Sequence, residues 1–350
     1  MKIAFAYNVK RNKPSLDIAK QDDFDFDSPE TIKGIEYTIK SLGHEVVRVE
    51  ADQNAFLKLK RLKGKIDLVF TIAEGLYGDA RESQIPIICE ILKIPYTHSN
   101  ATTHAIKLDK SLCKLAIRGI DVYVPNSFIL KKDIIRNGVT NGTAQPLFPG
   151  KIKYPLLIKP NKEGSSIGVF DKNVVQNEKQ MKMRMRKLYK DGFKGELMAE
   201  EYIDGREFTV AVVGNKNLKV LPILEQRFDF LPKGFNKLAS FELKWLFEDT
   251  LKNLTDAYDC PAKVSKKLQR EIEETSLAIY KALNVRDCAR IDYRLSAKGE
   301  LYFIEINTLP GITPDLNVIS YLPIIARTAG LSYKDLVGLI IKEARGRYGI

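Results

Sequence analysis

The segment from Arg290 to Asn307 constrains this chain more than any other, because it predicts a hairpin whose acidic side chains face each other. Two runs rich in Ile, Tyr, Phe and Leu flank Lys298-Gly299, a pair that suits a two-residue hairpin turn. A turn centred there places Asp292 opposite Glu305, and Arg290 opposite Asn307, on one face of the sheet. Carboxylates directly opposite each other repel and destabilise a strand pair. The pattern therefore needs a partner that removes this repulsion.

A hard cation between the two carboxylates is such a partner. Asn307 would add a carboxamide oxygen, and oxygen-only ligation with room for phosphate oxygens suits Mg²⁺. The alternative is a surface hairpin with scattered charges, which explains any one of these residues equally well. The four residues together, followed by the tight bend at 309–311, favour a nucleotide–metal site.

Length and composition restrict the class of protein. A chain of 350 residues usually forms two or three domains. It contains no run of 18 apolar residues, so no membrane span is expected. The start reads as a first strand and not as a signal peptide, because polar residues interrupt it at Asn8 and Lys10. Four dispersed cysteines without a CxxC pair indicate a reduced, cytoplasmic protein, and three histidines make a zinc site or a Ser–His–Asp triad unfavourable.

The net charge of +12 raises the question of nucleic-acid binding. The most cationic segment, 179–190, carries Met181, Met185 and Leu188 at helical spacing, which predicts an amphipathic helix with a solvated basic face. No stacking-aromatic or recognition-helix signature accompanies the charge. We therefore expect no nucleic-acid partner, and the excess of Lys and Arg suits anionic small-molecule substrates.

The first hundred residues alternate between strand and helix patterns. Ser28-Pro29 is a typical helix start, and the helix is expected to end at Gly43. This order predicts a small parallel sheet covered by helices. The expected strands lie at 3–7, 45–49 and 67–72, and a second helix at 56–63. The polar loop 73–82 follows the third strand, at the edge where open α/β sheets bind ligands.

The remaining chain changes in character after residue 101. A helix is expected at 103–115, an exposed linker at 137–151, and a strand, a loop and a strand over 154–170. Strand patterns over 197–230 precede a long irregular stretch, 232–258, which is typical of a functional lid. A helix at 261–283, the hairpin and a helix from about Tyr333 complete the chain.

The segment 163–168, Glu-Gly-Ser-Ser-Ile-Gly, is a candidate phosphate loop, because its N–H groups and hydroxyls can surround phosphate oxygens. It lacks the Walker A pattern, and alone it is often an ordinary hairpin. Lys159 precedes it on the entering strand, and Lys110 is a second candidate cation. By default each lysine would be a solvated surface residue.

Several motifs occur together in a fixed order, and in this order the chain resembles ATP-grasp ligases, most of all the D-alanine–D-alanine ligases, over nearly its whole length. The motifs are Ile158-Lys159-Pro160, 163–168, 200–210, Arg290-Ile291-Asp292 and 305–311. The segment Ile94-Pro95-Tyr96-Thr97 precedes them, and 258–262 lies between the third and the fourth.

The resemblance implies an ATP-grasp fold of the α/β class, α+β in its C-terminal half. An N-terminal parallel-sheet domain would occupy 1–100. A small central domain with the phosphate-covering loop would occupy 101–196. A C-terminal antiparallel-sheet domain, 197–350, would hold the metal site and the lid 232–258.

The resemblance also implies roles for individual residues. Lys110 and Lys159 would contact the phosphates of ATP, and Lys244 would reach the terminal phosphate from the lid. Arg290 and the Gly311 N–H would stabilise the oxyanion of a tetrahedral intermediate. The loop over the phosphates would comprise Ser165, Ser166 and Ile167. An interdomain hinge would hold adenine, with Glu207 on the ribose; its members are Glu200, Glu201, Tyr202 and Ile203. Two Mg²⁺ ions, or Mn²⁺, would be bound by Asp292, Glu305 and Asn307.

The implied reaction is ATP-dependent ligation of a carboxylate and an amine through an acyl phosphate, with amino acids or other carboxylic acids as small-molecule substrates and a homodimer as the expected assembly. An alternative is an ATP-binding module that has lost catalysis, although the intact Lys159, Arg290 and Glu305 argue against it.

The substrate residues depart from the family pattern. The serine for the second substrate falls at Leu316, with Asn317 or Thr313 as substitutes, and the glutamate for the first has only Glu30 as a loose counterpart. Glu74-Gly75 stands where His-Gly is usual, and Trp245 replaces a lid tyrosine. The pair of substrates therefore stays open.

Overall fold

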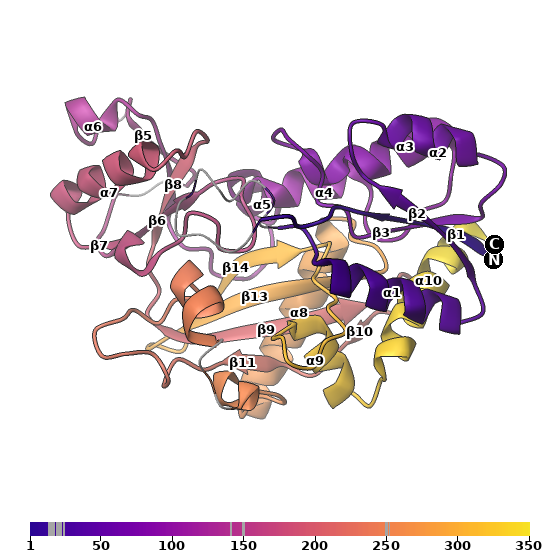
Figure 1. The fold of residues 1–350 in the computed structure, drawn as a ribbon. Helices are drawn as coiled ribbons and strands as arrows, with labels where there is room; N and C mark the ends of the chain where they lie inside the picture. The colour runs from indigo at the N-terminus through magenta and orange to yellow at the C-terminus, as the bar shows by residue number, and fades with distance from the viewer. Residues whose placement is uncertain are drawn as a thin grey trace.

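The computed structural model describes residues 1–12, 18, 23, 25–140, 142–148, 151–248, 251 and 253–350, the side chains of Trp245 and Leu246 excepted. These residues form three sheets, which lie at the upper right, upper left and bottom of Figure 1. The prediction for Trp245 thus concerns a side chain outside the described part.

The N-terminal sheet is parallel, in the order β2-β1-β3, as the alternating pattern predicted. Ser28 caps the first helix: its hydroxyl accepts the Thr31 N–H at 3.1 Å, so the helix begins at Pro29. The elements are β1 (Lys2–Tyr7), α1 (Pro29–Ser41), β2 (Glu45–Glu50), α2 (Ala55–Leu62), β3 (Leu68–Thr71), η2 (Arg81–Ser83) and α3 (Gln84–Leu92).

The predicted helix 103–115 is wrong in one respect, because it is two helices. Asp109 has an extended backbone, and its carboxylate accepts the Leu112 N–H at 3.0 Å, which begins a new helix. Lys110 thereby becomes the first residue of the second helix. The two helices are α4 (Ala101–Leu108) and α5 (Lys110–Ala116).

The central sheet is antiparallel, in the order β5-β4-β8-β6-β7. Met181, Met185 and Leu188 are fully buried against it, which confirms the amphipathic helix. The predicted linker 137–151 contains a strand. The elements are β4 (Ser127–Leu130), α6 (Ile134–Asn137), β5 (Ala144–Pro146), β6 (Leu156–Pro160), η3 (Asp171–Asn173), β7 (Val174–Val175), α7 (Glu178–Lys190) and β8 (Leu197–Glu201). Since β8 pairs within this sheet, we propose a domain boundary after Glu201 rather than at 197.

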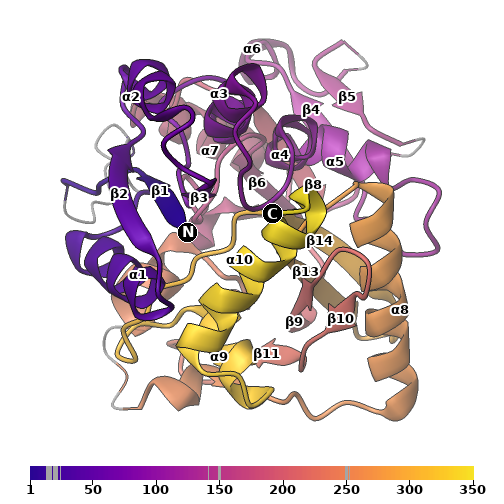
Figure 2. The same cartoon turned by 90° about the vertical axis from the view of Figure 1, so that its right-hand side faces the viewer.

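The C-terminal sheet has the order β12-β11-β9-β13-β14, with β10 paired to β9. Helix α8 covers one face of it, and α9 and α10 lie beside it (Figure 2). The elements are β9 (Gly205–Val213), β10 (Lys219–Val220), β11 (Leu224–Gln226), η4 (Leu243–Phe247), η6 (Leu254–Ala257), β12 (Tyr258–Asp259), α8 (Lys266–Ala282), β13 (Cys288–Ser296), β14 (Leu301–Asn307), α9 (Tyr321–Thr328) and α10 (Tyr333–Tyr348).

The hairpin of β13 and β14 has the predicted register at the site but a different turn. The pairs Arg290–Asn307 and Asp292–Glu305 are both present. Near the tip, however, Tyr293 pairs with Phe303, and a Ser296–Glu300 hydrogen bond of 3.0 Å closes a three-residue loop with Gly299 at φ +80°. The predicted two-residue turn is therefore wrong. Ile304 is an extra residue on β14, a bulge that restores the register before Glu305.

One hydrophobic core joins the two ends of the chain. Buried residues of β1, β3 and α1 pack with those of α9 and α10 and with Ala211 and Val213 of β9. Helices α1 and α10 accordingly lie side by side in Figures 1 and 2. The central sheet has a separate core, which includes Phe241 from the predicted lid.

Candidate active site

A cleft of about 110 Å³, partly open to solvent, is lined by residues of the central and C-terminal sheets. Thirteen of the predicted site residues line it: Lys110, Lys159, Ser165, Ser166, Glu200, Glu201, Tyr202, Ile203, Glu207, Lys244, Arg290, Asp292 and Glu305. The structure thus brings together residues that are up to 195 positions apart in sequence.

Strands β13 and β14 supply the acidic floor of the cleft. Asp292 accepts hydrogen bonds from Thr209 Oγ1 at 2.7 Å and from Arg290 Nε at 3.2 Å, and Arg290 Nη2 lies 3.1 Å from its other oxygen. Asn307 Oδ1 accepts the Leu309 N–H at 3.0 Å. The described residues contain no cluster of three or more His, Cys, Asp or Glu suited to a metal. A hard cation here would therefore use Asp292, Glu305 and the Asn307 oxygen together with oxygens of a ligand.

Glu305 has fewer close polar contacts than Asp292. Its carboxylate is 40% exposed toward the cleft and lies 3.9 Å from Lys110 Nζ. Burial acts to raise the pKa of Glu305, but Lys110, Lys159, Lys244 and Arg290 outweigh it and lower this pKa. Glu305 is therefore ionised at neutral pH, in a cleft that five basic and five other acidic residues line.

The Gly/Ser loop and the lid lie against each other. Ser165 and Ser166 both have positive φ, at 46° and 61°, in a tight turn closed by the Ile167 N–H and the Gly164 carbonyl at 2.9 Å. Ser166 Oγ donates to the Ala239 carbonyl at 2.8 Å, and the Phe241 N–H donates to the Val169 carbonyl at 2.7 Å. The segment 232–248 thus covers the loop, and η4 brings Lys244 to the cleft.

Beneath the loop, three buried charges form an ion triad of Lys114, Lys159 and Glu200. Lys159 Nζ lies 2.7 Å from one oxygen of Glu200, and Lys114 Nζ lies 2.9 Å from the other. Burial raises the pKa of Glu200, but Lys114 and then Lys159 outweigh it and lower this pKa to about 2. The triad holds Lys159 at the floor of the cleft.

Glu200→Gln is expected to lower the urea midpoint of unfolding at pH 7, because two buried lysines lose their carboxylate. Breaking a buried ion pair from one side costs about 3–5 kcal/mol. In the native protein the folded pKa of Glu200 lies below its ordinary 4.5, so its stabilisation is present above pH 4.5 and is lost as the pH falls toward 2. The free energy of unfolding of the variant should lack the part of its pH dependence below pH 4.5 that Glu200 contributes.

Glu201→Gln is the matched control, since the neighbouring Glu201 is half-buried and contacts Asn126 at 3.3 Å. Equal urea midpoints for the two variants would contradict a stabilising triad.

The hinge between β8 and β9 is fixed by its backbone and by a second ion pair. The Glu201 and Tyr202 N–H groups donate to the carbonyls of Asn126 and Pro155. Arg294 Nη1 donates to the Ile203 carbonyl at 3.2 Å, and Arg294 Nη2 lies 2.7 Å from Glu207. Burial raises the pKa of Glu207 in spite of this contact. The predicted hinge thus lies at the cleft wall, with Glu207 held by Arg294.

Three predicted residues do not line the cleft. Ile167 is 8% exposed and packs in the core of the central sheet, because its N–H closes the loop turn. Asn307 is the last residue of β14, and Gly311 follows it, exposed beside the hydroxyl of Ser320. The prediction that the loop with Ile167 closes over the phosphates stays a prediction.

The structure shows which residues surround the Pro-Gly bend. Leu316 is 66% exposed, and Asn317 is exposed and bonds to Asp315. Ser320 Oγ instead donates to the Gly311 carbonyl at 3.0 Å and accepts the Thr313 N–H at 3.3 Å. Ser320, which precedes α9, thus brings one hydroxyl to the bend, and Tyr333 brings another, which donates to the Ile312 carbonyl at 2.6 Å.

On the opposite side, Arg81 connects the N-terminal loop to the Gly/Ser loop. Its guanidinium contacts Asp25 at 2.9 Å, Glu163 at 3.1 Å and the Lys162 carbonyl at 2.9 Å. Burial, followed by repulsion from Glu82 and Asp25, raises the pKa of Glu74 well above its ordinary value. Glu30 is exposed on α1. The loop predicted at 73–82 thus reaches the phosphate loop through Arg81.

Sequence reasoning missed Lys114, Arg294, Arg81, Ser320 and Tyr321. Two of these had a readable signal. Lys114 follows Lys110 by one helical turn, and Arg294 alternates with Arg290 and Asp292 on one strand face. The others depend on how irregular segments fold, and no periodicity marks them.

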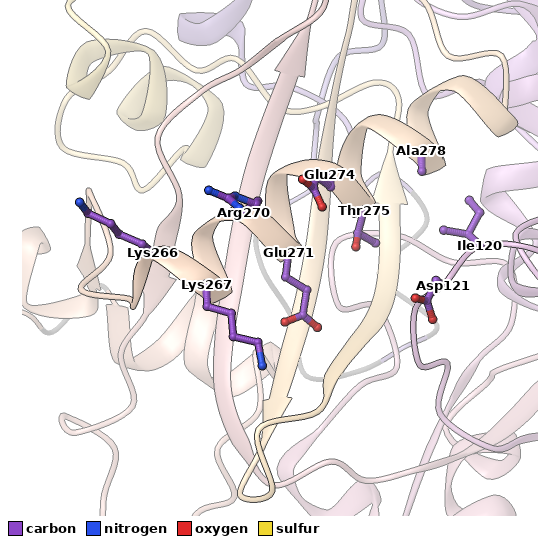
Figure 3. Close-up of a pocket in the computed structure, with 9 residues that line it drawn as sticks. All are labelled: Ile120, Asp121, Lys266, Lys267, Arg270, Glu271, Glu274, Thr275 and Ala278. Atoms are coloured by element: carbon purple, nitrogen blue, oxygen red, sulfur yellow. The ribbon is translucent and has the colours of Figure 1, made fainter.

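A second hollow lies along α8, away from these residues (Figure 3). It is bordered by Lys266, Lys267, Arg270, Glu271 and Glu274, with Asp121 across it. These charges lie on the solvent-facing side of an amphipathic helix, as expected for its surface. The chemistry of the molecule is concentrated in the cleft.

A family model described as D-ala D-ala ligase C-terminus matches residues 121–342, well over half of the chain. The chain belongs to the D-alanine–D-alanine ligase family. Its curated relatives include a D-alanine–D-alanine ligase of Aquifex aeolicus, 31% identical over 90% of this chain and 94% of that protein. Another from Fervidobacterium nodosum is 33% identical over 89% and 92%. An uncharacterised protein of Sinorhizobium fredii, y4sG, is 32% identical over 89% and 86%.

Solved structures support the same fold for this D-alanine–D-alanine ligase family member. The D-alanine–D-alanine ligase of Bacillus anthracis, complexed with ATP, has a TM-score of 0.69 at 23% identity, covering 100% of this chain and 99% of that chain. The VanG D-Ala:D-Ser ligase of Enterococcus faecalis has 0.67 at 21% identity, covering 98% and 99%. The chain is thus an ATP-grasp ligase, an ATP-dependent enzyme that forms carbon–nitrogen bonds. No helix among the described residues is long and apolar enough to cross a bilayer.

Proposed function

We propose that this protein joins two amino acids in an amide bond through an acyl phosphate, with ATP and Mg²⁺. The observation that carries the proposal is the composition of the cleft. Asp292 and Glu305 pair across β13 and β14 and face Lys110, Lys244 and Arg290. Carboxylates for a divalent cation and cations for a triphosphate therefore share one site.

The residues fit magnesium by their chemistry. Asp292, Glu305 and Asn307 offer hard oxygen donors, and Glu305 has a carboxylate open to the cleft. When bound, the cation would supply charge neutralisation for phosphate oxygens. Lys110, Lys159 and Lys244 would hold the phosphates, while the segment 232–248 excludes water from a reactive acyl phosphate.

The reaction has two steps. A substrate carboxylate oxygen attacks the γ-phosphorus of ATP, and the bond to the β-phosphate oxygen breaks, which gives an acyl phosphate and ADP. The amine of the second substrate then attacks the carbonyl carbon and loses a proton, and phosphate leaves as the carbon–oxygen bond breaks. Arg290 stabilises the oxyanion of this second step. No covalent nucleophile of the enzyme is required.

Two features bear on the substrates. We propose that the hydroxyl of Ser320, beside Gly311, binds the carboxylate of the second amino acid in place of Leu316. Asp25 adds an acidic group beside the Gly/Ser loop, where Arg81 joins it to Glu163, and Glu74 stands where the family pattern usually has a histidine. Because relatives are named for these pairs, we propose small amino acids as substrates, with D-alanine and D-alanine or D-alanine and D-serine as the first pairs to test.

The proposal predicts phosphate release that depends on a pair of amino acids. Purified protein with MgATP should turn over with at least one pair when D- and L-amino acids are offered two at a time, and the product is identified by mass spectrometry. Each amino acid alone is the control. ATP binding without turnover across the whole set would favour a binding module and contradict the proposal.

A further inference from the structure

The guanidinium of Arg290 lies over the ring of Tyr321, the first residue of α9. Arg290 Cζ is 5.2 Å from the ring centroid, and the Arg290 side chain is 14% exposed. A guanidinium over an aromatic face is attracted to it, more strongly where water is excluded. Tyr321 thus forms a support for the flat side of Arg290, while Asp292 binds its edge.

The Tyr321 ring is itself held from behind. Its hydroxyl donates to Gln226 Oε1 at the end of β11. Gln226 is 3% exposed, and its amide nitrogen donates to the carbonyls of Ala257 at 2.9 Å and Arg227 at 3.0 Å. These two bonds occupy both amide hydrogens, so the carboxamide oxygen must face Tyr321. The ring is therefore fixed in one orientation.

This chain of contacts also reaches the lid. Ala257 is the last residue of η6, where the segment 232–258 returns to the sheet, and its carbonyl accepts the Arg227 N–H at 2.7 Å. The C-terminal end of the lid, Gln226, Tyr321 and Arg290 are in continuous contact.

We infer that Tyr321 is a positioning residue for Arg290 and that Gln226 holds Tyr321 in place. The inference rests on the proposed function of Arg290. Asp292 is both a partner of Arg290 and a proposed magnesium ligand, so its oxygens are shared when the site is loaded. Tyr321 is not a proposed ligand of the cation. It therefore keeps the guanidinium at the cleft when the oxygens of Asp292 bind magnesium.

The test compares substitutions that keep or remove the ring. Tyr321→Leu should lower kcat by about 10- to 100-fold, because misplacing a catalytic group by an ångström has that effect, while the KM for ATP stays within about threefold. Tyr321→Phe and Gln226→Leu keep the ring, and each should lower kcat by less than about tenfold. Tyr302→Leu is the control, since Tyr302 lies on the same sheet away from the cleft, with its ring tilted against that of Tyr123 at 5.3 Å between centroids.

A readout without turnover separates positioning from damage to the fold. The Nε–H signal of Arg290, assigned with the Arg290→Lys variant, should show restricted motion in ¹⁵N relaxation of the native protein and faster motion in Tyr321→Leu at an unchanged melting temperature. An unchanged kcat in Tyr321→Leu, or unchanged Arg290 mobility, would overturn the inference. If the native protein shows no turnover with any amino-acid pair, the proposed function is contradicted. The relaxation measurement would still test whether Tyr321 restricts the motion of Arg290.

Discussion

Glu305→Gln should reduce ligase turnover by at least about 10²- to 10³-fold, the loss that follows removal of one preorganised polar group at a reacting phosphate or carbonyl. Glutamine keeps the shape of the side chain but removes the negative charge. Glu305 is the carboxylate that four cations keep ionised, and it lies open to the cleft. Without its charge, the cleft retains its lysines but loses one of two carboxylates for a divalent cation, so the Mg²⁺ concentration for half-maximal activity should rise as well.

The measurement is phosphate release as a function of Mg²⁺ at saturating ATP and amino acids. Glu300→Gln is the matched control, because Glu300 lies at the tip of the same hairpin and contacts Ser296 and Tyr302. Near-native turnover of Glu305→Gln, with an unchanged Mg²⁺ requirement, would remove Glu305 from the metal site.

Arg290→Lys is expected to have a comparable effect, a loss of kcat of about 10²- to 10³-fold, or about 3–4 kcal/mol in the barrier. Burial opposes the charge of Arg290, but Asp292 and Glu305 raise its pKa above the ordinary value, so the residue is a permanent cation in the native protein. Lysine would keep the charge. It cannot reproduce the planar fork that contacts Asp292 through two nitrogens while its face lies on Tyr321.

The loss should appear in kcat, whereas the affinity for MgATP measured by calorimetry should change little, because the oxyanion forms only after the phosphate has been transferred. Arg206→Lys provides the comparison: Arg206 makes a bidentate pair with Glu225 at 2.6 Å on the same sheet, outside the cleft. If Arg290→Lys retained native kcat, oxyanion stabilisation would have to come from another group.

The sequence was most informative where side-chain pairing is determined locally. Asp292 and Glu305 could be placed opposite each other because strand pairing near a turn allows few registers. The pairing was right although the turn was not: one extra loop residue and the bulge at Ile304 compensate for each other. A loop residue and a bulge leave no separate trace in a hydrophobic pattern.

The N-terminal elements were predictable for a different reason. Ser28, Pro29 and Gly43 carry strong local preferences for the ends of a helix, and the structure uses each of them. Asp109 carries the same kind of capping signal, but it lies inside an apolar pattern that continues through it. The break that orients Lys110 was therefore overlooked.

Residues that depend on tertiary contacts could not be predicted in the same way. Ser320 and Tyr321 lie after an irregular segment whose length differs from the expected spacing, and their position is decided by packing of α9 on the sheet. Arg81 reaches Glu163 across 82 residues of chain. Such contacts follow from the way three sheets assemble, which local preference does not encode.

The common core of the first and last helices bears on how a nucleotide enters. Because α1, α10 and the inner strands of the C-terminal sheet bury their side chains in one cluster, we expect them to move as one unit. The central sheet has its own core and takes Phe241 with it. We therefore expect a nucleotide to enter as the Gly/Ser loop and Phe241 move together relative to that cluster, while the acidic floor of β13 and β14 stays still.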